Sequence, residues 1–163
     1  MAGEVIADDV RLLQACDIIR QCRGGPGGQH ANKTATGVRL RHRASGLQVQ
    51  ACEHRSGEAN RAAALRRLRL ALACSVRGGS DPAWLRPHVS GGRLACGAQA
   101  PSWPAVAAVL LDALQAASGE VRAAASVCRL STTQLIRALC SDQPVRAAAD
   151  AIRDQASLPR LRP

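Results

Sequence analysis

The sequence predicts an α+β fold: a small antiparallel sheet with a packed helix and a projecting Gly-Gly-Gln loop, followed by a C-terminal helical module. Segments 37–41 and 47–52 alternate apolar and polar residues at period two, as strands with one buried face do. Segment 58–76 and the last third of the chain instead repeat apolar residues at helical spacing. These patterns place the strands early in the chain and most of the helices late.

The first elements are short. An imperfect apolar stripe predicts a helix over 8–15, and 17–22 is typical of a strand. The strand over 37–41 turns at 44–46 and returns over 47–52, which makes a hairpin. The outer face of this hairpin is expected to carry basic residues, namely Arg39, Arg41 and Arg43.

A long helix over 58–76 is expected to pack across the sheet. Leucine and valine recur along it at three and four residues, and arginines occupy its other sides. Ser56 is a suitable N-cap, and Gly78-Gly79 with Pro82 would end the element.

The chain changes character after this helix. Segment 79–103 is rich in glycine and proline and predicts a long irregular connection that folds back on a neighbour through apolar residues, namely Trp84, Leu85, Val89, Leu94 and Trp103. Helices follow over 104–117 and 144–155. The predicted organisation is a first domain over 1–78, the connection over 79–103, and a helical module over 104–163.

Residues 119–140 resemble the helix-turn-helix at the C-terminus of Fis-type DNA-binding proteins. Small alanines stand where two helices would cross, and Ser131 with Gln134 forms a capping box for the second helix. Arg129 departs from the pattern, because glycine usually holds this turn position. Arg137 is the one basic residue of the expected reading helix, so a hairpin that packs without binding DNA is the alternative.

The positive charge is concentrated in the first half of the chain. From Arg20 to Arg77 there are 12 basic residues against two acidic ones, so this segment carries the whole net charge of +10. Such a density attracts polyanions by releasing condensed counterions. An evenly solvated basic face fits less well, because the acidic residues that normally intersperse it are missing.

The cysteines and the N-terminus argue against several classes of site and of protein. Seven cysteines without a Cys-x-x-Cys pair favour reduced apolar fillers over a disulfide framework or a metal site, and Cys22 is the one thiol worth testing for reactivity. Residues 1–9 contain acidic side chains and no long apolar run, so neither a signal peptide nor a membrane span is expected. A cytoplasmic protein without metal or cofactor is the prediction.

Residues 23–34 read Arg-Gly-Gly-Pro-Gly-Gly-Gln-His-Ala-Asn-Lys-Thr. Four glycines and a proline within five positions suit neither a helix nor the interior of a sheet. The segment therefore predicts a loop in which Gly27 and Gly28 let main-chain N–H groups approach a ligand without an intervening Cβ. Gln29 is the polar side chain that this loop delivers.

The loop and the residues after it resemble the catalytic domain of the class-I peptide-chain release factors and of their short ribosome-rescue relatives of the ArfB type. The shared runs, in the family's order and spacing, are Gly27-Gly28-Gln29, Asn32-Lys33-Thr34, 38–42, Ser45-Gly46, 53–56 and Asn60-Arg61. The resemblance covers roughly residues 17–73. It implies that the loop projects from its scaffold into the peptidyl-transferase centre and hydrolyses the ester that joins a peptide to tRNA.

The resemblance implies an enzyme, a peptidyl-tRNA hydrolase that acts on the ribosome. Gln29 is a neutral amide, so it can orient water but cannot act as a general base near pH 7. Main-chain N–H groups around Gly28 and Gln29 are the stronger candidates for stabilising the oxyanion. The expected catalytic residues are therefore Gly27, Gly28 and Gln29, and Gln29 is also a candidate for side-chain methylation by a glutamine methyltransferase, since the family's glutamine is commonly methylated.

Basic and polar side chains around the loop, the hairpin and the long helix are expected to bind RNA by shape. They are Arg23, His30, Asn32, Lys33, Arg39, Arg41, Arg43, Arg55, Arg61, Arg66 and Arg67. The chain has no evident Ser-His-Asp set, and its four histidines, His30, His42, His54 and His88, are expected to pack or to contact RNA. The expected partners are the large ribosomal subunit and peptidyl-tRNA, and residues 119–140 are a candidate second nucleic-acid contact.

Two departures decide which member of the family this chain resembles. A chain of 163 residues leaves no room for a stop-codon-reading domain, so codon-independent hydrolysis is expected. The end of the chain also lacks the basic tail with which short rescue factors sense an empty mRNA channel. The alternative hypothesis is a non-catalytic RNA- or DNA-binding regulator that uses residues 119–140. The sequence leaves open which stalled or split ribosome is the substrate, what senses it, and the oligomeric state.

Overall fold

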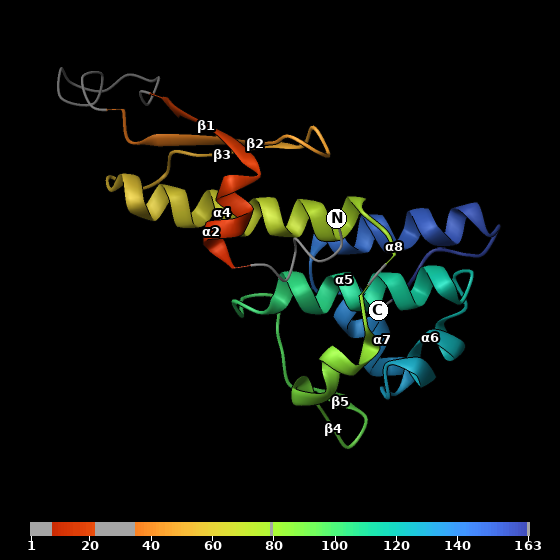
Figure 1. The fold of residues 1–163 in the computed structure, drawn as a ribbon. Coiled ribbons are helices and arrows are strands. Elements are labelled where there is room, and N and C mark those ends of the chain that lie inside the picture. Colours follow the sequence, from red (N-terminus) through yellow and green to blue (C-terminus); the bar gives the residue numbers. More distant parts are fainter. Residues whose placement is uncertain (1–7, 22–34, 79, 163) are drawn as a thin grey trace. The chain divides into compact units, whose positions relative to one another are not determined.

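The computed structural model describes residues 8–21, 35–78 and 80–162, and Figure 1 shows their fold. The chain divides into two compact units, one ending at Leu72 and one beginning at Ala73. We call them the sheet unit and the helical unit. The predicted α+β class is confirmed: the sheet unit contains a three-stranded antiparallel sheet with helices, and helices make up most of the helical unit.

The sheet has the order β1-β2-β3. Strand β1 (Cys16–Gln21) pairs with β2 (Gly37–His42), and β2 pairs with β3 (Gln48–Ala51), both antiparallel. Val38 and Leu40 of β2 are buried, whereas Arg41 is exposed. The predicted hairpin is therefore confirmed, because burial of alternate side chains fixes the register of a strand.

Two helices complete the sheet unit. Helix α2 (Asp9–Gln14) begins at Asp8, whose carboxylate accepts a hydrogen bond from the Arg11 amide at 2.7 Å. Helix α4 (Gly57–Ser75) runs alongside the sheet (Figure 1) and buries Leu65, Leu68 and Leu72. Its predicted cap is confirmed, since the Ser56 hydroxyl accepts from the Ala59 amide at 3.4 Å.

Helix α5 (Trp103–Ala116) is the centre of the helical unit and is buried along most of its length. It packs against η1 (Pro82–His88), α6 (Val121–Val127), α7 (Thr132–Cys140) and α8 (Gln143–Gln155). Burial of an almost wholly apolar helix by its neighbours supplies the main hydrophobic stabilisation of this unit.

The segment that precedes α5 is more regular than the glycine and proline content predicts. It contains the 3-10 helix η1 and the strands β4 (Val89–Ser90) and β5 (Arg93–Leu94), which pair antiparallel. The Asp81 carboxylate caps η1 by accepting from the Ala83 amide at 2.8 Å, and Leu85 is buried. Capping and the burial of one leucine therefore order a stretch whose composition alone is typical of a loop.

Helices α6 and α7 form the predicted helical hairpin. Helix α6 ends in a Schellman motif, in which the Leu130 amide donates to the Ala125 carbonyl at 2.9 Å and the Arg129 amide to the Ser126 carbonyl at 3.1 Å. Arg129 has a φ of 56°, the left-handed value for which glycine is usually chosen. The predicted cap of α7 is confirmed, since the Ser131 hydroxyl accepts from the Gln134 amide at 3.2 Å.

Replacing Arg129 by glycine is expected to raise the free energy of unfolding by about 0.5–1 kcal/mol, because glycine adopts a positive φ without a Cβ clash. Chemical denaturation of the full chain measures this change. Arg137→Gly is the matched control, because Arg137 lies inside α7, where glycine should lower the free energy of unfolding by about 1 kcal/mol. Equal destabilisation by both substitutions would contradict the account of the turn.

Candidate functional site

The sheet pairs the two strands that flank segment 22–34 in the sequence. Strand β1 ends at Gln21, β2 begins at Gly37, and these two residues are direct partners in the ladder. A Cβ added at Gly37 would lie 2.9 Å from the Gln21 carbonyl oxygen, so the two strands approach closely at this point. The predicted catalytic residues Gly27, Gly28 and Gln29 lie outside the described residues, as do Arg23, His30, Asn32 and Lys33.

A buried amide ties this end of the sheet to α4. The Asn60 side chain is fully buried, and its Nδ2 atom donates to the carbonyls of Thr36 at 2.8 Å and His54 at 2.9 Å. Its Oδ1 atom accepts from the His54 amide at 2.9 Å. One side chain thus fixes the residue before β2 and the turn after β3 to the same helix. Asn60 belongs to the run Asn60-Arg61 that resembles the release factors, but no role was predicted for it. Its signal in the sequence was that it is the one side-chain amide in α4, whose other residues are mostly Ala, Leu and Arg.

A hollow of about 360 Å³ lies beside the same end of the sheet. Its lining includes Ile18 and Arg20 of β1, Thr36, and Glu58 and Arg61 from the first turns of α4. The guanidinium groups of Arg20 and Arg61 make no hydrogen bond or ion pair within the described part of the chain, and Glu58 is the one carboxylate of the lining. Two free guanidinium groups near a helix N-terminus can hold a phosphate.

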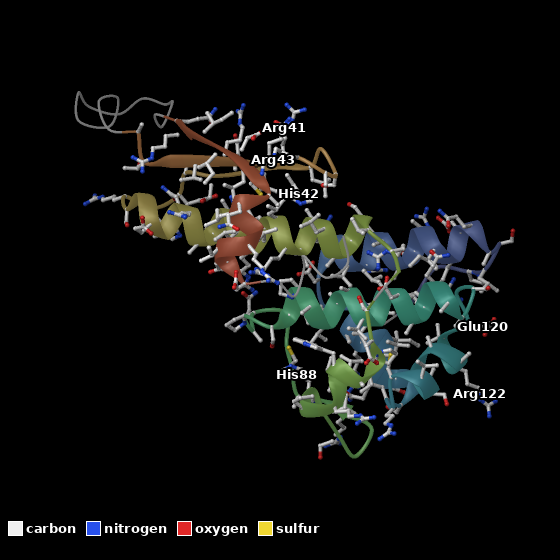
Figure 2. All side chains as sticks on the ribbon, in the orientation of Figure 1. Arg41, His42, Arg43, His88, Glu120 and Arg122 are labelled. Atoms are coloured by element: carbon white, nitrogen blue, oxygen red, sulfur yellow. The ribbon has the colours of Figure 1, made fainter. Side chains whose placement is uncertain are left out.

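The predicted RNA contacts among the described residues differ in what their side chains already bind. Arg41 and Arg55 are exposed and make no side-chain bond to the described residues (Figure 2 labels Arg41). Arg39 is half-buried, with Nη2 3.5 Å from the Gln50 side-chain oxygen. Arg61 lines the hollow, and Arg66 is exposed. These five arginines lie on β2, on the turn after β3 and on α4.

Two further predicted contacts, Arg43 and Arg67, are engaged inside the sheet unit. The Arg43 guanidinium donates to the carbonyls of Gln14 and Cys16 and to the Asp17 carboxylate at 3.2 Å. Arg67 pairs with Glu53 at 2.5 Å, and this hydrogen bond lowers the pKa of the Glu53 carboxyl below its usual value. Both arginines therefore hold the fold together whether or not they also reach RNA.

The histidines show no arrangement for nucleophilic catalysis within the described part of the chain. His42 is buried, with its Nδ1 atom 2.8 Å from the Ser45 hydroxyl, and so it braces the turn after β2. His54 is exposed, and the His88 ring lies 5.3 Å from the Trp84 ring in the helical unit. His30 lies outside the described residues.

The cysteines within the described ranges form no disulfide bond. Burial raises the pKa of Cys74 and of Cys128 to about 11, so both thiols stay protonated at neutral pH. Cys22 lies outside the described residues. Within the same ranges no three His, Cys, Asp or Glu side chains are grouped as metal ligands would be, and no helix is long and apolar enough to cross a bilayer.

Comparison with known proteins identifies the first half of the chain. The family model described as "RF-1 domain" matches residues 15–79. Peptide chain release factor 1 of Dictyoglomus thermophilum is 51% identical over 49 residues, which cover 30% of this chain and 13% of that protein. A peptide chain release factor homolog of Escherichia coli is 52% identical over 59 residues, 36% of this chain and 29% of the homolog. Peptide chain release factor 2 of Sulfurimonas denitrificans is 46% identical over 75 residues, 44% of this chain and 20% of the factor.

The similarity is local on both sides. The matched segment spans less than a third of the length of each of these relatives, and helices α5 to α8 lie beyond the RF-1 domain match. No solved structure matches the chain significantly. Residues 15–79 therefore match the RF-1 domain and are similar in sequence to part of the class-I peptide chain release factors.

Proposed function

We propose that this chain hydrolyses the ester bond of peptidyl-tRNA on the ribosome and thereby releases the peptide. The observation that carries the proposal is the RF-1 domain match over residues 15–79, which includes Gly27-Gly28-Gln29. The pairing of Gln21 with Gly37 supports it, because it brings together the two strands that flank this segment in the sequence. Residues 1–78 then act as the catalytic domain.

The chemistry requires a water molecule at the ester carbonyl carbon and donors for the oxyanion that develops. In our proposal the main-chain N–H groups at Gly28 and Gln29 supply the donors, and the Gln29 amide orients the water. Glu58 is the one carboxylate among the described residues that line the hollow at this end of the sheet, and our proposal gives it no role in the hydrolysis. The ribosomal RNA and the tRNA itself would form the rest of the active site.

The body of the sheet unit would bind ribosomal RNA through phosphates. Arg20, Arg41, Arg55 and Arg61 are the best candidates, because their guanidinium groups are not engaged by other described residues. The hollow that Arg20 and Arg61 share would hold a phosphate next to the loop. The partners are then the large subunit and peptidyl-tRNA in the cytoplasm, and Gln29 is a substrate for a glutamine methyltransferase.

We further infer that release by this chain does not depend on a stop codon, as in rescue of stalled or split ribosomes. The family match ends at residue 79, and the chain continues into a helical unit built around α5. Purified ribosomes carrying labelled peptidyl-tRNA test this inference, with a stop codon, a sense codon or no codon in the A site. We expect the release rates of the stop and sense complexes to agree within about two-fold. A chain that reads the bases of the codon would instead release peptide much faster from the stop complex.

A second candidate function is a non-catalytic nucleic-acid-binding regulator, which the two short helices α6 and α7 and the tight turn between them favour. Helix α7 carries Arg137 as its one basic residue, so base recognition in a major groove is weakly supported. The release assay separates the two functions. A wild-type chain that binds nucleic acid but releases no peptide from any of the three complexes would favour the regulator.

A further inference from the structure

The basic residues of the helical unit fall into two sets. The first set is engaged within the unit: Arg77 pairs with Asp112, Arg146 with Asp150 and Arg160 with Asp154, while Arg153 donates to the carbonyls of Gly119 and Pro159. The side chains of the second set make no hydrogen bond or ion pair to any described residue, and this set comprises Arg86, Arg93, Arg122, Arg129, Arg137 and Arg162. The second set is available for an external partner.

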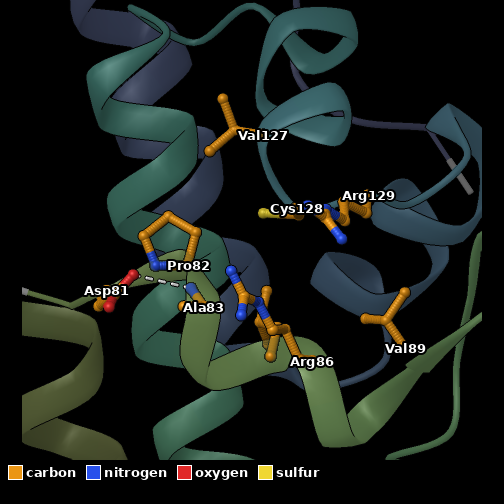
Figure 3. A pocket seen from close by; sticks show the side chains of 9 residues that line it. Asp81, Pro82, Ala83, Arg86, Val89, Val127, Cys128 and Arg129 are labelled. Carbon is orange, nitrogen blue, oxygen red and sulfur yellow. Dashed lines mark hydrogen bonds between the residues drawn. The ribbon is translucent and has the colours of Figure 1, made fainter.

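Two arginines of the second set share one hollow. It has a volume of about 410 Å³ and lies between η1 and the end of α6. Arg86 from η1 and Arg129 from the α6–α7 turn both line it, as Figure 3 shows. Among the described residues that line the hollow, Asp81 is the one carboxylate, and its Oδ1 atom already accepts from the Ala83 amide. Two guanidinium groups at one hollow without a carboxylate bridging them repel each other, and an anion would relieve that repulsion.

The backbone holds both arginines in fixed positions. Leu85, next to Arg86, is 1% exposed and anchors η1 in the unit. Arg129 is held at a φ of 56° by the two Schellman hydrogen bonds of α6. An arginine at a strained position without an intramolecular bond to its side chain points to a function for that side chain. The planar guanidinium fork suits the oxygens of a phosphate.

A third arginine extends the site. The Ser131 amide donates to the Gly92 carbonyl at 2.9 Å, which ties the β4–β5 turn to the residues that follow Arg129. Arg93, the next residue after Gly92, is exposed, and its side chain makes no hydrogen bond or ion pair to the described residues. Two arginines that line a hollow, with a third on a neighbouring turn, fit successive phosphates of a polyanion better than a single free phosphate.

We propose that this hollow is a second RNA-binding site of the chain, in which Arg86 and Arg129 bind phosphates of the RNA backbone. The choice of RNA over DNA rests on the proposed function of the sheet unit. The site differs from a helix-turn-helix that reads bases, because its cations come from η1 and the turn and not from the exposed side of α7. It would anchor the helical unit on ribosomal RNA by shape and charge, without reading sequence.

The test compares two double variants of the full chain that lose the same charge. Arg86→Gln/Arg129→Gln empties the hollow of cations and keeps a non-glycine residue at the strained position. Arg146→Gln/Arg160→Gln removes two arginines of the engaged set. Fluorescence anisotropy with a labelled RNA hairpin, over a series of salt concentrations, reports the affinity, and thermal unfolding checks that both variants fold.

The first double variant is expected to bind the hairpin about ten-fold more weakly than wild type at physiological salt. The slope of log K against log salt concentration should be less steep than that of wild type by about 1.4–1.8, the contribution of two phosphate contacts. The control is expected to bind within about two-fold of wild type. If both double variants bind the hairpin equally weakly, or if the first binds it as tightly as wild type, the proposed site is wrong.

A DNA duplex of the same sequence is the second probe. Tighter binding of the duplex than of the hairpin, lost in Arg86→Gln/Arg129→Gln, would overturn the assignment to RNA. A peptide-release assay tests the proposed function independently of this RNA-binding site. If wild type releases no peptide while RNA binding still depends on Arg86 and Arg129, the proposed function fails and the site stands.

Discussion

Replacing Gly28 by alanine is expected to lower the single-turnover rate of peptide release by about 100-fold or more, the usual cost of losing one oxyanion donor. The added methyl group would clash with the end of the tRNA or exclude the φ that lets the main chain donate to the ester oxygen. The measurement is release of labelled peptide from purified ribosome complexes at saturating protein. Ribosome binding by the variant, followed by sedimentation, should change little.

The matched control is Gly46→Ala. Gly46 lies in the turn between β2 and β3 with a φ of 71°, and no described atom lies within 4 Å of its added Cβ. The variant should lose about 1 kcal/mol of stability to backbone strain and keep its release rate within about two-fold. If Gly28→Ala releases peptide as fast as Gly46→Ala, the backbone-donor mechanism is wrong.

The largest expected effect on stability is at Asn60. Asn60→Asp keeps the size of the side chain but removes both N–H donors, and it sets a carboxylate against the carbonyl oxygens of Thr36 and His54. We expect the free energy of unfolding of the sheet unit to fall by about 3 kcal/mol, because two carbonyls lose their donor and a charge is placed at a buried position. Denaturant unfolding followed by circular dichroism measures the change.

Gln50→Glu supplies the control for Asn60→Asp. Gln50 lies on β3 and is exposed, so the same change from amide to acid should shift stability by less than about 0.5 kcal/mol. An Asn60→Asp variant as stable as Gln50→Glu would show that the bonds of Asn60 do not hold this end of the sheet to α4.

The two predictions at Arg129 link stability to binding. Arg129→Gly should stabilise the α6–α7 turn, whereas Arg129 with Arg86 should bind RNA. If replacing Arg129 raises the stability of the chain and also lowers its affinity for RNA, the strained backbone at this position serves binding at a cost in stability.

Periodicity was sufficient to locate most elements because each of them buries one face. Burial of Val38 and Leu40 demands the alternation that predicts β2, and the three buried leucines of α4 demand its helical spacing. The capping residues Ser56 and Ser131 were readable for the same reason, since local hydrogen bonds leave a local signal.

The features that the sequence did not show depend on tertiary contacts. The order of η1 and of β4–β5 rests on Asp81 as a cap, on the burial of Leu85 and on the Gly92 carbonyl. The sequence indicated an apolar role for Leu85, whereas the glycine-rich composition hid the other two contacts. The engagement of Arg43 and Arg67 by carbonyls and carboxylates cannot be distinguished by composition from a free basic face. The role of Asn60 appears only when Thr36 and His54 meet at one helix.

A reconstruction of the wild-type chain on a ribosome whose peptidyl-tRNA carries a non-hydrolysable amide link tests the central claim most directly. The account predicts the Gly28-Gln29 backbone at the peptidyl-transferase centre, with an N–H group about 3 Å from the position of the developing oxyanion. A chain bound with its sheet unit away from that centre, and with Gln29 remote from the tRNA end, would contradict it.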